Sequence, residues 1–297
     1  MSRPTSNARP VVSFGLPVRN GAPTIAQALE SVLAQTFDDW ELIISDNLST
    51  DGTSEICAEF ATRDARIRHV PTGRDLTLHE NFRETFRLAR GTYFRWQGDD
   101  DWLEPEYAER AVAALAASPS SVLCTTVQRH YRDERPLPIN DPLPVLGGVD
   151  STDPADRVRA LLRLFQDGGH LGIDPVYSLV RRDVAAKTRL QGSIRDGDFV
   201  YSCEVALLGP FVHVPEVLAN RRLPGDARGT PASKTLVGRP AWHRFVQREV
   251  SILQVAEASR GLPVGSRIGI GAALVRFAIR EHAHGVRRRA RRLTSRL

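Results

Sequence analysis

The stretch "VVSFGLPVRNGAPTIAQALESVLAQTFDDWELIIS" (residues 11–45) contains the first unit of the alternation of strands and helices that decides the fold. The apolar run Val11–Leu16 predicts a strand. Apolar residues from Ile25 to Leu33 recur at helical spacing, and Glu41–Ser45 predicts a second strand. A strand, a helix and a strand in this order predict two parallel strands joined by a crossover helix.

The alternation continues to residue 127. Strands are predicted at 67–70, 92–97 and 121–127, and helices at 53–62, 80–90 and 105–117. Gly91 is expected to end its helix in the left-handed conformation, and Pro105 to open the next helix. The fold class that follows is α/β, with a mostly parallel central sheet and helices on both faces.

The second half of the chain is less regular. A Pro- and Gly-rich excursion is expected over 130–154, followed by a helix around 161–165 and a strand at 176–181. A helix at 198–209 and a short strand at 211–214 come next. Residues 221–240 are predicted to be polar and flexible, and two helical stretches form a C-terminal extension.

The composition fits a soluble globular protein, with 41% hydrophobic and 25% charged residues among 297. No apolar run is as long as a membrane span, and the first ten residues lack the apolar core of a signal peptide. Cys57, Cys124 and Cys203 lie far apart in apolar stretches, which predicts buried thiols. The expectation is therefore a cytoplasmic protein.

The formal net charge of +5 is concentrated at the C-terminus, in "RRRARRL" (Arg287–Leu293). Such a run is most often a solvated tail. The functional alternative is attraction to anionic lipid head groups, which would place the protein peripherally at the inner face of the membrane. Nucleic acid is not expected as a partner, because no aromatic residues that could stack on bases are interleaved there.

Polar segments follow three of the predicted strands: "PVRNG" (Pro17–Gly21), "SDNLSTDG" (Ser45–Gly52) and "GDDDW" (Gly98–Trp102). In sheets of this kind, ligands bind at the carboxyl ends of the strands. The glycine spacings of a Rossmann fold, a P-loop and a sugar-1-phosphate nucleotidyltransferase first loop are all missing. A nucleotide's phosphates would therefore need another neutralising group.

Asp99, Asp100 and Asp101 can provide that group. Mg²⁺ or Mn²⁺ is typically held by one or two carboxylates, with nucleotide phosphates completing the shell. The alternative is a solvated acidic turn, but the triplet follows an apolar strand at the ligand-binding end of the sheet. Asp46 ends another strand, where its carboxylate could contact a ribose or a base, or could simply cap the following turn.

The segments "VSFGLPVRNGAPTIAQALESVLAQTFDDWELIISDNLSTDGT" and "ENFRETFRLARGTYFRWQGDDDWLEPEY" resemble, in order, the motifs of family 2 glycosyltransferases of the GT-A fold. "DFVYSCEVALLGPFVHVPEVLANRR" resembles a downstream segment of one branch. The resemblance covers roughly residues 11–222. It implies a nucleotide-sugar-binding half at 11–128 and an acceptor-binding, catalytic half at 129–222. A disordered lead-in (1–10) and a flexible basic segment with C-terminal helices (223–297) lie outside it.

The resemblance also implies roles for single residues. The residues placed beside the nucleotide base are Pro17, Val18 and Asn20, with Asp46 contacting the base. Asp99 would lie near the ribose, Asp100 on the metal, and Asp101 would support the loop or the donor sugar. Three positions depart from the family pattern: Asn47 replaces a frequent second acid, Gly98 replaces the first acid of D-x-D, and Arg19 replaces a common aromatic residue.

An inverting transfer needs a base that deprotonates the acceptor hydroxyl. The resemblance aligns Asp198 with the catalytic carboxylate, although an Asp before an apolar helical run is also a good N-cap. Asp196 and Glu204 are reserve candidates, and Glu204 fits a structural acid better. Arg221 and Arg222 could close over the diphosphate as part of a lid, or could belong to a solvated loop. His170 could line the acceptor site or lie at the surface.

The function implied is transfer of a sugar, with inversion and metal assistance, from a nucleotide-diphosphate sugar to an acceptor hydroxyl. A UDP-sugar is the first expectation, in a hexosyltransferase of glycan, polysaccharide or glycoconjugate biosynthesis. The acceptor would be a glycan, a lipid-linked molecule or a small molecule. The alternatives are a catalytically silent GT-A-like nucleotide-binding module and a sugar-1-phosphate nucleotidyltransferase.

Overall fold

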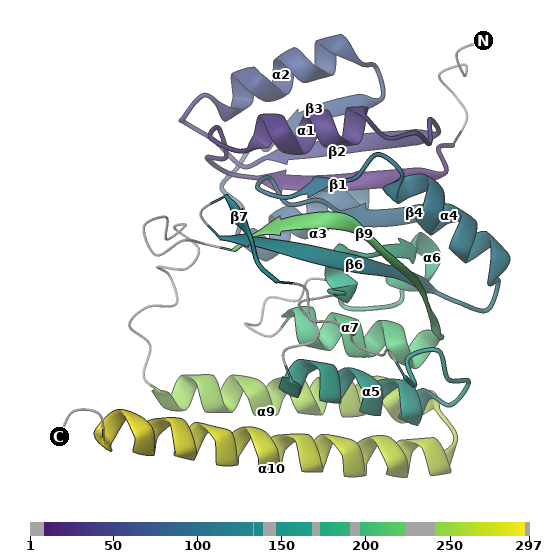
Figure 1. Ribbon diagram of the computed structural model, residues 1–297, viewed down its shortest axis with the longest axis vertical. Helices are drawn as coiled ribbons and strands as arrows, with labels where there is room; N and C mark the ends of the chain where they lie inside the picture. Colours follow the sequence, from purple (N-terminus) through teal and green to yellow (C-terminus); the bar gives the residue numbers. More distant parts are fainter. Residues whose placement is uncertain are drawn as a thin grey trace.

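The computed structural model describes residues 9–132, 134–138, 147–167, 173–190, 197–223 and 241–294, with the backbone alone for 241–248 and 283–294. The predicted site residues Asp196 and His170 lie outside these ranges. In the described part of the chain a nine-stranded sheet has the order β3-β2-β1-β4-β8-β6-β9-β5, with β7 paired to β6. Figure 1 shows this sheet between layers of helices.

The first four strands in that order form a parallel unit: β1 (Val12–Val18), β2 (Trp40–Asp46), β3 (Ile67–Pro71) and β4 (Tyr93–Trp96). In its register Val18 pairs with Asp46, and Gly15 pairs with Trp96. The predicted strand-helix alternation is therefore confirmed. The carboxyl ends of β1, β2 and β4 meet at one edge of the sheet.

The other half of the sheet is mixed. β8 (Leu179–Arg181) runs antiparallel to both β4 and β6 (Leu123–Arg132). β9 (Phe211–Arg222) is parallel to β6 and antiparallel to the short β5 (Trp102–Leu103), and β7 (Arg135–Pro136) is antiparallel to β6. Because β9 runs beside β6 and pairs with β5, it brings residues near 220 to the segment that follows the acidic triplet.

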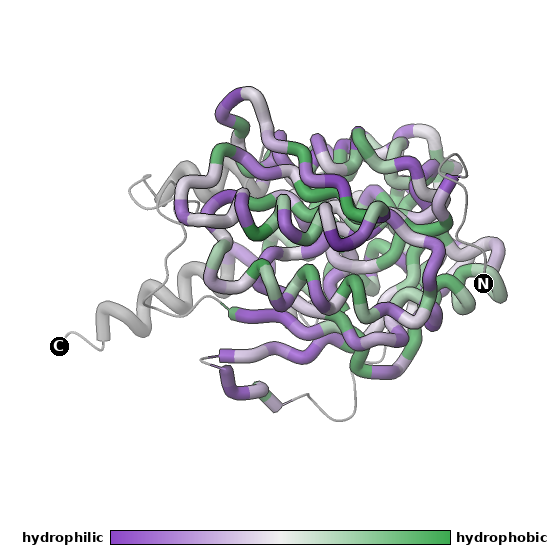
Figure 2. The backbone as a smooth tube through the Cα atoms, turned by 90° about the horizontal axis from the view of Figure 1, so that it is seen from above, coloured by the Kyte–Doolittle hydropathy of each residue, from purple (hydrophilic) through white to green (hydrophobic). Residues whose placement is uncertain are grey.

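Helices cover both faces of the sheet, as predicted. One core joins the strands to α1 (Ile25–Leu33), α2 (Thr53–Arg63) and α4 (Tyr107–Ala117). A second core joins the other face to α3 (Leu78–Leu88), α5 (Pro154–Asp167), α6 (Arg182–Ala185) and α7 (Gly197–Leu208). Hydrophobic and hydrophilic residues alternate along the helices in the view from above, as amphipathic elements require (Figure 2).

A third core lies among helices alone. Residues of α5 and α7 pack there against α9 (Ala241–Ala258) and α10 (Val264–Thr294), and the rings of Phe199 and Phe277 stack with centroids 5.3 Å apart. Figure 1 shows α9 and α10 at the end of the molecule opposite α2. No helix among the described residues is both long enough and apolar enough to cross a membrane.

The three thiols are free and fully buried, as the sequence predicts. Burial raises the pKa of the thiols of Cys57 and Cys124 to about 12, which makes both inert at neutral pH.

Three local predictions are wrong. The helix before Gly91 ends at Leu88, and the φ of Gly91 is not in the left-handed region. A glycine is needed there because a Cβ would lie 2.7 Å from the backbone nitrogen of Ser13. β6 and β9 also run to Arg132 and Arg222, well beyond their predicted ends, because they pair with each other along most of their length.

Candidate active site

The loops that follow β1 and β2 are tied together by hydrogen bonds. The backbone N–H of Asn20 donates to the Oγ of Ser49 at 2.9 Å, and its side-chain oxygen accepts from the N–H of Thr50 at 2.9 Å. The N–H of Gly21 donates to the Oγ1 of Thr53 at 2.9 Å. The "RNG" and "STDGT" segments therefore form one wall of a shared edge, and Asn20 takes a positive φ of 57° there.

The acidic triplet lies on a supported loop after β4. The N–H of Gln97 donates to the carbonyl of Gly15 at 2.9 Å, and its Nε2 donates to the carbonyl of Asp101 at 2.7 Å. Beneath it, the buried guanidinium of Arg95 donates to the Oε1 of Gln97 at 2.5 Å. The triplet is thus held by the sheet and is not a free acidic turn.

Two glycines bring carboxylates close to the backbone. A Cβ on Gly21 would lie 2.3 Å from Oδ2 of Asp99, so the carboxylate of Asp99 packs directly on the loop after β1. A Cβ on Gly98 would lie 2.7 Å from Oδ2 of Asp101 and 3.2 Å from Oδ1 of Asp100. Gly98, a departure from the family's D-x-D pattern, leaves room for these two carboxylates.

Asp101 is a buried, paired carboxylate. Nε of Arg221 donates to Oδ2 of Asp101 at 3.1 Å, and the backbone N–H of Arg222 donates to Oδ1 at 3.2 Å. Arg221 also donates to Asp174 and lies 3.9 Å over the ring of Tyr177. Burial opposes the charge of Arg221, but the carboxylates of Asp101 and Asp174 together raise its pKa.

The prediction that Arg221 and Arg222 lie in a flexible segment is wrong, whereas their contact with a diphosphate stays a prediction. Both are the last residues of β9, and the guanidinium of Arg221 is used within the protein by two carboxylates. Arg222 donates to Gln27 at 2.8 Å and to Glu134 at 3.0 Å, and lies 5.3 Å over the ring of Trp102. Strand pairing with β6 fixes both backbones, so neither residue belongs to a solvated loop.

Asp99 and Asp100 have the opposite surroundings. Burial, followed by the negative charges of Asp101 and Asp51, raises the pKa of Asp99 to about 6. Burial, followed by the charges of Asp101 and Asp99, raises the pKa of Asp100 to about 7. Across the described ranges, neither side chain has a hydrogen bond or ion pair with another residue. The two partly buried carboxylates thus have no ion pair among the described residues, and the charge of Arg221 only partly offsets that of Asp100.

This arrangement suits a divalent cation that is shared with a ligand. Carboxylate oxygens are the donors that Mg²⁺ and Mn²⁺ prefer, and such ions usually take the rest of their shell from water and phosphates. No cluster of three or more His, Cys, Asp or Glu among the residues with described side chains could hold a metal by itself. The residues fit an ion that also needs a nucleotide diphosphate.

Asp46 ends β2 at the same edge and is buried. Its carboxylate accepts hydrogen bonds from the N–H of Ser49 at 3.2 Å and from the hydroxyl of Ser54, and lies 3.5 Å from Nε2 of His69. The neighbouring Asn47 accepts from the N–H of Leu76 at 2.9 Å. The turn-capping role considered for Asp46 is therefore present, and its contact with a base stays a prediction.

The other residues predicted to lie beside the base are at the end of β1. Pro17 and Val18 are buried, and Asn20 is exposed on the loop that follows. Arg19, which replaces a common aromatic residue, is half-exposed and pairs with Asp75 at 2.5 Å. These positions are at the edge of the site, and their contacts with a nucleotide stay predictions.

The predicted base, Asp198, is exposed in the first turn of α7. α7 begins at Gly197, so Asp198 lies inside the helix rather than at an N-cap. Burial is the main cause that raises the pKa of the partly buried Tyr177, and the charge of Asp198 contributes to it. Asp198 therefore lies within electrostatic range of Tyr177, whose ring contacts Arg221, the partner of Asp101.

Glu204 lies one and a half turns further along α7 and is buried. It accepts a hydrogen bond from the backbone N–H of Arg189 at 2.7 Å and pairs with the guanidinium of the same residue. Its role in the structure is to anchor the segment around residue 189, as a structural acid would.

Sequence reasoning missed three residues of the site: Arg95, Asp174 and Tyr177. Asp174 stands before Pro175 and accepts from the N–H of Val176 at 3.1 Å, as a cap of the short 3₁₀ helix η2 (Pro175–Tyr177). That Asp-Pro pair is a recognisable local signal. Its pairing with Arg221 spans 47 residues, and no local pattern could have shown it.

Known proteins share both the sequence pattern and the fold. A model described as Glycosyl transferase family 2 matches residues 13–189, more than half of the chain. The putative glycosyltransferase EpsE of Bacillus subtilis is 34% identical over 110 residues, 37% of this chain and 40% of that protein. The uncharacterized protein y4gI of Sinorhizobium fredii is 28% identical over 231 residues, 76% of this chain and 24% of that protein. The chain spans less than half the length of these relatives.

Two solved structures extend the comparison to the fold. S. aureus TarS 1-349 in complex with UDP-GlcNAc superposes with a TM-score of 0.64 at 14% identity, covering 90% of this chain and 72% of that one. The mannosyltransferase PcManGT from Pyrobaculum calidifontis, in complex with GDP-Man and Mn²⁺, gives a TM-score of 0.53 at 18% identity over 96% and 81%. The fold is that of the GT-A glycosyltransferases. Within that class, the chain belongs to glycosyl transferase family 2.

Proposed function

We propose that this protein transfers a sugar from a nucleotide-diphosphate sugar to an acceptor hydroxyl, with inversion at the anomeric carbon and assistance from Mn²⁺ or Mg²⁺. The observation that carries the proposal is the pair Asp99 and Asp100 at the carboxyl ends of β1 and β4, whose pKa values are raised and which form no ion pair among the described residues. The similarity to S. aureus TarS 1-349, solved in complex with UDP-GlcNAc, supports a UDP-sugar donor. A glycan acceptor is supported by a relative named chondroitin synthase, from Escherichia coli, 30% identical over 125 residues.

The donor site uses the three loops at the shared edge. Asp100 would hold the cation, and Asp99, packed on Gly21, would lie towards the ribose. A cation bound there would neutralise the diphosphate and act as a Lewis acid on the leaving group. Pro17, Val18, Asn20 and Asp46 would surround the base. Asp101 is less suited than Asp99 and Asp100 to bind a cation, because Arg221 already neutralises its charge.

In the transfer step, Asp198 would act as the base. Asp198 is an exposed carboxylate in the first turn of α7, and it would remove the hydroxyl proton as the oxygen attacks the anomeric carbon. The bond between the anomeric carbon and the diphosphate breaks on the opposite side. The contacts of Arg221 with Tyr177 and with Asp101 support this assignment, because the charge of Asp198 acts on Tyr177.

A thermal-shift experiment tests the donor site. UDP and GDP are added with and without MnCl₂, in the presence of EDTA for the metal-free arm. The wild type should gain about 5 °C in Tm with one nucleotide and Mn²⁺ together, at a nucleotide concentration near a hundred times Kd. Neither Mn²⁺ nor the nucleotide alone should give this gain, because each completes the other's coordination.

Two variants make the experiment specific. Asp100→Ala should lose the combined shift, whereas Asp38→Asn should keep it, since the side chain of Asp38 is 95% exposed and precedes the amino end of β2, opposite the carboxyl end where the site lies. A nucleotide shift of equal size in EDTA would refute the metal site. A full shift in Asp100→Ala would remove Asp100 as its ligand.

A further inference from the structure

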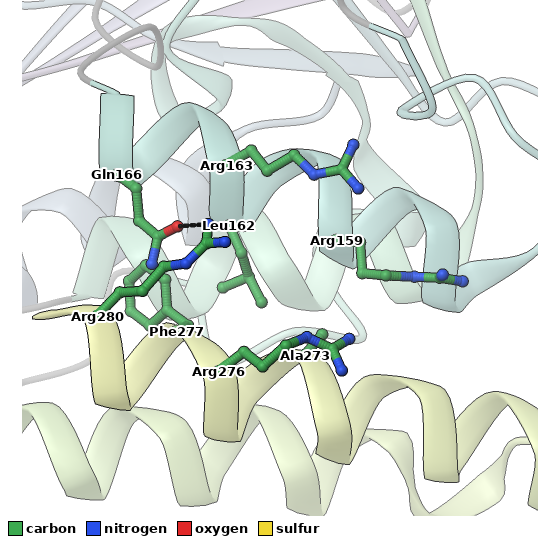
Figure 3. A pocket seen from close by; sticks show the side chains of 8 residues that line it. All are labelled: Arg159, Leu162, Arg163, Gln166, Ala273, Arg276, Phe277 and Arg280. Carbon is green, nitrogen blue, oxygen red and sulfur yellow. Dashed lines mark hydrogen bonds between the residues drawn. The ribbon is translucent and has the colours of Figure 1, made fainter.

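The helical end of the molecule carries a second concentration of unbalanced charge, far from the acidic loop along the chain. A pocket of about 120 Å³ lies between α5 and α10, and four of its lining residues are arginines. Figure 3 shows Arg159 and Arg163 on α5 facing Arg276 and Arg280 on α10. Four like charges around one pocket repel each other unless an anion lies among them.

The protein itself supplies little neutralisation. Arg159 pairs with Asp156 at 2.6 Å, and Arg280 donates only a 3.4 Å hydrogen bond to the amide oxygen of Gln166. Within the described ranges, Arg163 and Arg276 have no hydrogen bond or ion pair. The pocket therefore has a surplus of guanidinium donors suited to an anion such as a phosphate.

The same helix exposes an apolar stripe. The side chains of Val264, Ile268, Val275 and Ile279 are between 59% and 68% exposed. Their spacing of four, seven and four residues places them on one face, because 3.6 residues make a turn. The opposite face of α10 is buried through Ile270, Ala273, Leu274 and Phe277. A helix that is already packed on one side does not need a second apolar stripe for folding.

Arginines lie on both sides of this stripe. At 100° per residue, Arg267 projects on one flank and Arg276 and Arg280 on the other. The only acidic residue between Val264 and His282 is Glu281, which projects towards the buried side. Aliphatic side chains with flanking arginines and no exposed acid match the surface of an anionic bilayer, where apolar side chains enter the acyl boundary and arginines bind phosphates.

We propose that the exposed face of α10 is a docking surface for an anionic phospholipid bilayer, with the four-arginine pocket binding lipid phosphate groups. A second copy of this chain fits the face less well. Pairing two such faces would bring arginines against arginines, and no exposed acid on this part of α10 could neutralise them. The proposal is independent of the proposed sugar transfer, because it uses neither the acidic loop nor α7.

Vesicle flotation with the full chain tests the surface. The wild type should bind vesicles of 70% phosphatidylcholine and 30% phosphatidylglycerol at 0.1 M NaCl at least tenfold more strongly than pure phosphatidylcholine. This binding should weaken at 0.5 M NaCl, where charges are screened. Equal binding to both vesicle types, or none to either, would overturn the proposal.

The variants separate the charged from the apolar contribution. Arg163→Gln with Arg276→Gln should reduce binding to anionic vesicles by about tenfold or more, since each basic residue near such a surface contributes about fivefold. Ile268→Ser with Ile279→Ser should reduce it by a similar factor. The matched controls are Arg87→Gln and Leu78→Ser on α3, 67% and 53% exposed, which should bind as the wild type does.

Circular dichroism melting checks that every variant is folded. Losses of equal size in the controls would contradict a local surface. Sedimentation velocity gives the remaining outcome: a dimer that the isoleucine variant converts to a monomer would assign the stripe to a second copy and overturn the bilayer proposal.

Discussion

Asp100 and Asp101 are neighbours in the chain with opposite electrostatic surroundings. Asp101 is fully buried and receives Arg221 and the N–H of Arg222, whereas Asp100 has no partner among the described residues and its pKa rises to about 7. The sequence places three equal acids in a row. The difference between them arises because β9 ends beside Asp101 and brings Arg221 with it.

At the same scale, a substitution of Asp198 should distinguish donor binding from sugar transfer. Asp198→Asn should leave the cation-dependent Tm shift with UDP unchanged and reduce slow release of UDP from a UDP-sugar, with water as acceptor, by about a hundredfold or more. The amide keeps the shape of the side chain but cannot accept the proton. UDP release is measured by coupled assay over a panel of UDP-sugars.

Asp183→Asn is the matched control, because Asp183 is also an exposed acid in the first turn of a helix, α6. Its UDP release should equal that of the wild type. Turnover retained in Asp198→Asn would exclude Asp198 as the base.

At the scale of elements, the site is the meeting of loops from parallel strands. The polar residues of "RNG" and "STDGT" form hydrogen bonds that join the loop after β1 to the loop after β2. Asn47, which replaces a frequent acid, binds the backbone of Leu76 through both its amide groups at 2.8 and 2.9 Å. A carboxylate could accept the 2.9 Å bond from the N–H of Leu76 but could not donate the 2.8 Å bond to its carbonyl oxygen.

Gly21 is a position of close contact between the loop after β1 and the loop after β4. Gly21→Ala should displace the carboxylate of Asp99, because the new Cβ would lie 2.3 Å from its Oδ2 and 2.9 Å from Cγ2 of Val18. The expected result is an affinity for UDP with Mn²⁺ about tenfold lower, measured by isothermal titration calorimetry. Gly261→Ala is the control, since its Cβ meets no atom within 4 Å. Equal affinities in the two variants would contradict the assigned contact.

At the scale of the whole molecule, the two halves of the sheet contribute different residues to the candidate site. The parallel half presents Asp46, Asp99 and Asp100 at its edge, and the mixed half returns Asp174, Tyr177 and Arg221 to the same place. In the metal-free protein, the carboxylates of Asp99, Asp100 and Asp101 therefore repel one another, and this repulsion lowers the stability of the fold.

This repulsion predicts a pH dependence of stability. The folded-state pKa values of Asp99 and Asp100, about 6 and 7, lie above their ordinary value of 3.8. The protonated forms are thus favoured by folding, and their contribution, fully present below about pH 4, is lost as the pH rises through 6 and 7. In EDTA, Asp100→Asn should have a Tm at least about 2 °C above that of the wild type at pH 8.

At pH 4.5 the same two proteins should melt at similar temperatures, because Asp100 is then protonated and resembles the amide. Scanning calorimetry at both pH values makes the comparison, with Asp38→Asn as the exposed control. A Tm difference that is the same at both pH values would show that the charge of Asp100 is not its cause.

The local elements of the first half could be predicted because their cause is local. Apolar periodicity and turn residues place β1, α1, β2, α2, β3, α3 and β4 within a few residues of their observed bounds, and the order of motifs indicates the family. The lengths of β6 and β9 could not be predicted in the same way, since strand pairing between residues about 90 apart decides them.

The sequence by itself determined the alternating fold, the edge at which ligands are expected to bind and the acids that line it, because periodicity and strand order are properties of the chain. Only the tertiary structure decided which of those acids keeps an unbalanced charge. That depends on which arginine reaches which carboxylate, and Arg221 reaches Asp101 and Asp174 through contacts that span 120 and 47 residues. For that reason Asp99 and Asp100 form no ion pair within the part of the chain that the structure describes.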